Sequence, residues 1–96
     1  MIVHIVMFQF KEENKERNIA MVKERLEALV DLIPELQKME VGVNFNESER
    51  AFDLSLYSTF DSKEDLGVYA VHPEHLKVVA LIKELTETSK VVDYIL

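Results

Sequence analysis

The sequence contains no cysteine and no tryptophan, and it has only two glycines and two prolines among 96 residues. Without cysteine, disulfide bonds, zinc–thiolate sites and thiol catalysis are excluded. No apolar stretch approaches the roughly 20 residues that a membrane-spanning helix needs. The first ten residues also lack the uninterrupted apolar run of a signal peptide. We therefore expect a cytoplasmic protein.

Positive charge is scarce as well. Eleven Lys and Arg residues stand against 18 Asp and Glu, which gives a formal net charge of −7. Nucleic acids and anionic membrane surfaces are bound by patches rich in Lys and Arg, so neither is an expected partner. Apolar residues make up 48% of the chain and charged residues 30%, as is usual for a globular protein. We expect one domain over residues 1–96 with a single core.

The first half of the chain predicts a strand, a long helix and a second strand. Residues 2–10 are rich in β-branched and aromatic side chains, and both faces of this strand are apolar. Residues 15–33 carry apolar side chains at helical spacing, with Asn14 as a candidate N-cap and Pro34 as the stop signal. Residues 39–45 alternate between apolar and polar side chains, which is typical of a strand with one polar face.

The second half predicts a further strand, two short helices and a last strand. Residues 52–60 form a hairpin with the preceding strand. Ser62 and Asp65 have the spacing of a capping box, so a helix should begin there and end near Val71. A further helix starts at Pro73, with an apolar stripe at three-residue spacing. The members of that stripe are Leu76, Val79 and Ile82. Residues 90–96 form the last strand.

The element order β-α-β-β-α-β is typical of the ferredoxin-like arrangement. This α+β fold has a four-stranded antiparallel sheet with helices on one face. Its other face and its edges stay open. Because the first strand is apolar on both faces, we expect a second copy of the chain to cover the open face and form a homodimer.

The most informative stretch runs from Tyr69 to His75 and contains two of the three histidines and one of the three tyrosines. Pro73 disfavours helical backbone at His72 and is well suited to the first position of a new helix. The stretch therefore predicts two helices joined by a sharp corner. Tyr69 would lie on the last turn before the corner and His75 on the first turn after it, so their side chains can meet.

Two interpretations of this corner remain open. At the start of a helix the positive end of the dipole favours a neutral imidazole, so His75 could act as a general base on a carbon next to a carbonyl. Tyr69 could then donate a hydrogen bond to the developing enolate oxygen. Alternatively, these two side chains bond to each other or to backbone and only lock the corner. His72 and His75 could pair on a metal, but the proline interrupts their spacing, and we predict no metal site.

His4 lies among apolar residues of the first strand. A lone histidine there is more often a core residue with one hydrogen-bonding partner than a catalyst. If the His4 face of the strand meets the helices, however, His4, Tyr69 and His75 converge on one cavity. We predict that arrangement.

Four stretches carry a resemblance that spans nearly the whole chain: Met1–Lys11, Asp53–Phe60, Tyr69–His75 and Val92–Tyr94. With these stretches the chain resembles the stress-responsive A/B barrel domain family. The resemblance implies a homodimer whose two sheets pack face to face, a dimeric α+β barrel. Val78 stands where the family usually has Phe, and Ala51-Phe52 where it often has Gly-Tyr. The first change reshapes the pocket behind the corner.

One branch of that family, plant polyketide cyclases that close a ring by an intramolecular aldol reaction, resembles this chain at the corner. By motif position, the resemblance implies that its catalytic Tyr and His fall on Tyr69 and His75, and its pocket histidine on His4. We add three expected binding residues and no cofactor. The binding residues are His72, Val78 and Phe8.

The function predicted is binding of a small apolar molecule that carries a carbonyl group, with or without aldol or enolisation chemistry. Whether the protein is an enzyme stays open. One alternative is a structural or stress-related homodimer without a ligand. Another is a cofactor-free oxygenase or lactone isomerase, although the sequence patterns typical of those enzymes are absent.

Overall fold

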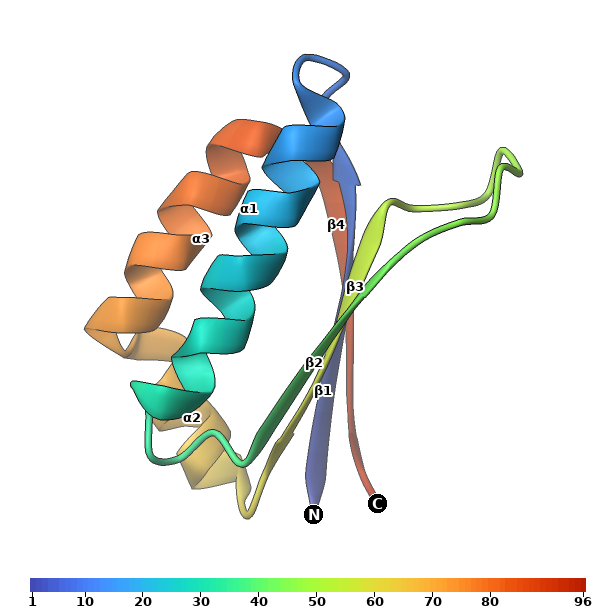
Figure 1. The fold of residues 1–96 in the computed structure, drawn as a ribbon. Coiled ribbons are helices and arrows are strands. Elements are labelled where there is room, and N and C mark those ends of the chain that lie inside the picture. Colours follow the sequence, from blue (N-terminus) through green and yellow to red (C-terminus); the bar gives the residue numbers. More distant parts are fainter.

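The computed structural model describes all 96 residues and shows one antiparallel sheet with helices on a single face (Figure 1). The strand order is β2-β3-β1-β4, which confirms the ferredoxin-like arrangement. The elements are β1 (Ile2–Phe10), α1 (Lys15–Glu27), the 3-10 helix η1 (Ala28–Asp31), β2 (Lys38–Val43), β3 (Leu54–Phe60), α2 (Lys63–Val71), α3 (Pro73–Leu85) and β4 (Thr86–Ile95). None of these helices is both long and apolar enough to cross a bilayer.

β1 lies in the centre of the sheet and sets which residues face the helices. His4 is paired with Ser58 of β3 and with Asp93 of β4, so these three positions share one face. The predicted orientation of β1 is confirmed, because the His4 face meets the helices. The main hydrophobic core fills the space between them. Its largest fully buried side chains are those of Phe10, Phe60, Tyr69, Leu26, Leu29, Ile33 and Leu54.

The first helix begins and ends differently from the prediction. Asn14 is the N-cap residue, but its backbone is left-handed (φ 54°) and its side chain makes no capping bond. A capping side chain needs an extended backbone at this position, whereas Asn is one of the residues that tolerates the left-handed region. The α-helix predicted over residues 15–33 ends at Glu27 and continues as the 3-10 helix η1. Helices commonly tighten into 3-10 geometry at their C-terminal turn.

β2 ends at Val43, two residues before the predicted end, because the next side chains compete for backbone hydrogen bonds. The Asn44 carboxamide oxygen accepts from the Asn46 backbone N–H, and Asn46 does the same for Ser48. Phe45, predicted as a strand residue, is 97% exposed. Residues 44–53 form an arm that leaves the sheet on the side away from the helices (Figure 1).

The start of β4 and the buried side of α3 are the next features to compare with the sequence. β4 begins at Thr86, four residues before the predicted start, since the threonines of that segment pair with the end of β1. On α3 the buried residues are Val78 and Ile82, so of the three apolar residues at three-residue spacing Ile82 is buried, whereas Leu76 is 50% exposed. The helix instead turns its 78 and 82 positions toward the sheet, which brings His75 to the same side.

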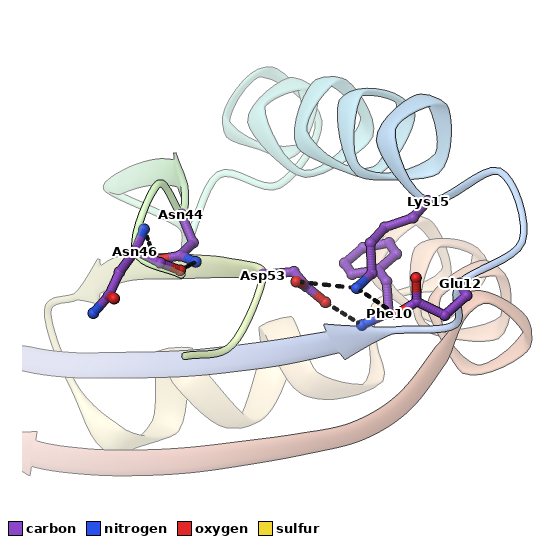
Figure 2. Close-up of polar contacts among 6 residues, drawn as sticks. All are labelled: Phe10, Glu12, Lys15, Asn44, Asn46 and Asp53. Atoms are coloured by element: carbon purple, nitrogen blue, oxygen red, sulfur yellow. Dashed lines mark hydrogen bonds and ion pairs between the residues drawn. The ribbon is translucent and has the colours of Figure 1, made fainter. Parts of the chain in front are cut away.

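The base of the arm is fixed to β1 and α1 by Asp53 (Figure 2). One carboxylate oxygen accepts a hydrogen bond from the Phe10 backbone N–H at 2.7 Å, and the other lies 3.5 Å from the Lys15 ammonium. Lys15 also donates to Glu12 at 3.0 Å. The Asp53 backbone N–H also donates to the Phe8 carbonyl. Asp53 therefore joins the arm to the end of β1 through both its side chain and its backbone.

We expect Asp53→Ala to lower the free energy of unfolding by about 1–3 kcal/mol, because the half-buried Phe10 N–H loses its charged acceptor. Urea unfolding of parent and variant measures this difference. The control is Glu12→Ala, whose carboxylate is almost fully exposed and should change stability by less than about 0.5 kcal/mol. Equal losses in the two variants would contradict the anchoring role of Asp53.

No helix or strand covers the sheet face opposite the helices (Figure 1), and apolar side chains occupy the centre of that face, with Lys38, Glu40 and Lys90 around them. Ile5 of β1 lies there between Tyr57 of β3 and Val92 of β4. Met7 and Tyr94 share this face, and Met7, Val92 and Tyr94 are exposed. We call these five residues the open face. Large exposed apolar patches mark surfaces at which proteins associate.

Candidate functional site

A cavity of about 290 Å³ lies between the His4 face of the sheet and helix α3. Its wall is mostly apolar and includes Phe8 and Val78, two of the predicted binding residues. All three predicted catalytic residues line it as well: His4, Tyr69 and His75. A second hollow lies under the arm beside Met7 and Phe52, but no titratable side chain lines it. The cavity beside α3 is the candidate site because it brings the three predicted catalytic residues together.

The helix corner has the predicted form, and His72 builds it. Its backbone is extended, and its Nδ1 accepts a hydrogen bond from the Glu74 N–H at 3.1 Å, so His72 caps the helix that begins with Pro73. This bond occupies Nδ1, and His72 is not part of the cavity wall. The structure therefore gives the predicted binding role of His72 no support.

Aromatic contacts hold the three cavity residues together. The Tyr69 and His75 rings are stacked with centroids 4.1 Å apart and an interplanar angle of 35°. Tyr69 also packs against Phe60 at 5.0 Å, and His4 meets it nearly edge-on at 6.3 Å. Centroid separations in this range are those of favourable aromatic pairs. Tyr69 therefore lies between the two histidines, in contact with the ring of each.

The hydrogen bond of His75 fixes which of its nitrogens is basic. Its Nδ1 lies 3.1 Å from the Ala70 carbonyl oxygen, which can only accept, so Nδ1 must carry a proton. In the neutral ring Nε2 then keeps its lone pair. Burial lowers the pKa of His75, and the positive charges that His4 and His72 can carry act in the same direction, while the Ala70 bond opposes both. His75 is therefore neutral at pH 7, with Nε2 as a base.

The lowered pKa of His75 makes the protein lose stability in acid. Below the ordinary histidine pKa of 6.5, His75 is protonated in the unfolded chain but stays neutral in the folded protein. The free energy of unfolding therefore decreases as the pH falls from 6.5 to the lower pKa of the folded state. We expect the decrease measured by urea unfolding over this window to be smaller in His75→Asn. An unchanged pH dependence in His75→Asn would contradict the assignment.

Tyr69 carries a polar atom with no hydrogen-bonding partner. Its side chain is buried, and its hydroxyl is the single buried side-chain N or O atom left unpaired. Burial raises its pKa, so the phenol stays protonated and remains a donor. An unpaired buried hydroxyl costs free energy, and few such groups persist without a reason. Tyr69 and His75 do not bond to each other, although the His75–Ala70 bond does help to lock the corner.

His4 has a charged partner that the sequence did not reveal. Its Nδ1 lies 2.5 Å from a carboxylate oxygen of Asp93 in β4. The carboxylate accepts a hydrogen bond from Nδ1–H and so orients the ring. Nε2 is then the nitrogen that is available to other partners. Asp93 lies within one of the resembling stretches, but only the strand register shows that it is opposite His4. No group of three or more His, Cys, Asp and Glu side chains is placed to hold a metal ion.

The fold and this cavity define a class: a ferredoxin-like domain with a histidine- and tyrosine-lined cavity between sheet and helices. The family model of the stress responsive A/B barrel domain matches residues 2–96. The chain belongs to this family, as its sequence stretches predicted. A stress-response A/B barrel domain-containing protein of Arabidopsis thaliana is 37% identical over 78 residues. That match covers 81% of this chain but only 30% of the longer plant protein.

Solved structures agree with the fold. A dimeric ferredoxin-like protein of unknown function from Bacteroides fragilis superposes with a TM-score of 0.88 at 37% identity, covering 97% of this chain and 93% of that one. A hydroxynitrile lyase from Passiflora edulis gives a TM-score of 0.88 at 23% identity, covering 99% and 92%. At that identity the second likeness shows the fold alone.

Proposed function

We propose that this protein binds a small apolar molecule with a carbonyl group in the cavity beside α3, and that it catalyses proton transfer next to that carbonyl. The observation that carries the proposal is the unpaired Tyr69 hydroxyl, stacked beside a His75 whose Nε2 is free to accept a proton. A carbonyl oxygen of a ligand is the simplest partner for that hydroxyl. The apolar wall suits the rest of such a molecule.

The chemistry follows from the roles of the two side chains. His75 Nε2 takes a proton from the carbon next to the carbonyl, and the electron pair of that C–H bond moves toward the carbonyl oxygen to form an enolate. The Tyr69 hydroxyl donates a hydrogen bond to this oxygen, where negative charge develops. The enolate carbon then takes the proton back from His75, or it attacks a second carbonyl carbon of the same molecule, and the alkoxide oxygen formed there takes that proton from His75. His4, held by Asp93, supplies a further donor or acceptor at the cavity wall.

Deuterium exchange at carbon tests this proposal. In D₂O, methyl octyl ketone should lose its protons next to the carbonyl faster with the parent protein than in buffer. His75→Ala should slow that exchange by about a hundredfold or more while the protein stays folded. The control Leu76→Ala removes an exposed neighbour and should exchange like the parent. Absence of ketone binding to the parent would contradict the proposal, and binding without exchange would leave only its binding half.

We also propose that the chain is a homodimer in which the open face of one copy covers that of the other. The Bacteroides fragilis relative is described as dimeric, and the apolar open face here has no other cover. The cavity lies on the opposite side of the sheet, so dimer formation does not fill it. The competing interpretation, a structural dimer without a ligand, is favoured by the His75–Ala70 bond but leaves the Tyr69 hydroxyl unexplained.

A further inference from the structure

The cavity has a second polar end that the proposed chemistry does not use. Lys83 and Ser89 line it, together with Thr86, at the end of α3 away from the helix corner. Lys83 carries the single charged side chain of the wall apart from the histidines, and no carboxylate lines the cavity. Lys83 is exposed and lies in the last turn of α3, so its ammonium group is accessible both to solvent and to the cavity.

Lys83 is free to bind an anion. Its ammonium group takes part in none of the ion pairs of the protein and in none of the lysine hydrogen bonds. Ser89 adds a hydroxyl that is likewise unbonded within the chain and lies opposite Phe8 in the sheet. An ammonium and a hydroxyl at one end of a cavity together provide the donors that a carboxylate accepts.

The helix dipole opposes an anion at this end, because the C-terminus of α3 carries partial negative charge. Two of its last carbonyl groups are, however, already satisfied. The Thr86 hydroxyl donates to the Ile82 carbonyl at 2.8 Å, and the Lys11 ammonium donates to the Glu84 carbonyl at 3.0 Å. The remaining repulsion between the helix terminus and a bound anion is weaker than the attraction between that anion and the Lys83 ammonium at contact distance.

Helix geometry gives the distance between the two ends. His75, Val79 and Lys83 follow one another at four-residue spacing on one side of α3, and all three line the cavity. Eight residues at a rise of 1.5 Å separate His75 from Lys83 by about 12 Å along the axis. A linear molecule that lies along α3 therefore meets Tyr69 and His75 at one end and Lys83 at the other.

We infer that the ligand of this cavity is a linear keto acid, whose carbonyl is held at Tyr69 and whose carboxylate is held about 12 Å away by Lys83 and Ser89. This inference rests on the proposed function and narrows its substrate class. The apolar wall between the two ends, with Val79 and Ile82 of α3, contacts the methylene chain. Val78 belongs to the same wall.

Three probes of equal chain length test this assignment by calorimetry. They are methyl octyl ketone, the keto acid with its ketone next to the terminal methyl group and a carboxylate at the other end, and the methyl ester of that acid. We expect the acid to bind the parent about threefold to fivefold more tightly than the ketone, as a partly exposed ion pair allows. The ester, which has no charge, should resemble the ketone. Added salt should reduce the advantage of the acid.

Two variants locate the effect. In Lys83→Met the ratio of acid to ketone affinity should fall to about one, while Lys77→Met, which removes an exposed lysine of the same helix outside the cavity, should keep the parent ratio. Ketone binding without an advantage for the acid would overturn this inference and leave the proposed function intact. The same holds if the advantage survives in Lys83→Met. Failure of all three probes to bind the parent would overturn both.

Discussion

Tyr69→Phe should make the free protein more stable and its ligand complex weaker. The substitution removes a buried hydroxyl that has no partner, which restores about 1–3 kcal/mol of unfolding free energy. It keeps the ring that packs against Phe60 and His75. It also removes the donor that we assign to the ligand carbonyl, so methyl octyl ketone should bind about fivefold more weakly. Urea unfolding without ligand and calorimetric titration with the ketone measure the two effects.

The opposite signs of these two effects make the prediction specific. A tyrosine that only fills the core would lose stability with its hydroxyl or change little, and ketone binding would not respond. The control Tyr57→Phe lies on the open face, away from the cavity, and should leave ketone affinity at the parent value. A less stable Tyr69→Phe protein would show that the hydroxyl is satisfied in the free state, and the main support for the proposed function would be lost.

Ile5→Asp should convert the dimer into monomers. Ile5 occupies the middle of the open face, between Tyr57 and Val92, so a carboxylate there would lose its contact with water when two copies associate. Leaving an unpaired charge in such a contact costs about 3–5 kcal/mol per copy, which exceeds what a small interface tolerates. Sedimentation at several protein concentrations gives the mass of parent and variant.

Asp is also a poor strand former, so Ile5→Thr provides a second variant with a polar but β-branched side chain. It should weaken the dimer while the circular dichroism of the monomer stays native. Leu76→Asp places the same charge on the exposed side of α3 and should leave the mass unchanged. A monomeric parent, or an Ile5→Asp protein that remains dimeric, would contradict the assignment of the open face.

Much of the fold could be predicted from the sequence because local signals and the global arrangement agree. The β-branched and aromatic residues of β1 and the Pro73 corner each have one consistent interpretation. The predictions that were wrong concern competition at element ends. Asn44 and Asn46 accept hydrogen bonds from the backbone N–H groups that follow Val43, and β2 is therefore shorter than predicted.

The candidate site was predictable only where a motif places its residues on one element or on adjacent ones. Tyr69 and His75 are joined by the corner, so their contact follows from local geometry. The pairing of His4 with Asp93 depends on the register between β1 and β4, which are separated by most of the chain. Lys83 is a surface lysine by composition, and its place in the cavity wall depends on how α3 rotates on the sheet.

Asp93 holds His4 in place from an edge strand, so the orientation of His4 in the cavity depends on how often that strand opens. β4 is an edge strand, and its last residues are exposed in the single chain. Edge strands open locally at lower free energy than the core, and each opening of β4 would release His4 from its carboxylate. A second copy that protects β4 would suppress those openings. Ligand binding and dimer formation would then be coupled, so that a ligand strengthens association and association strengthens ligand binding by the same factor.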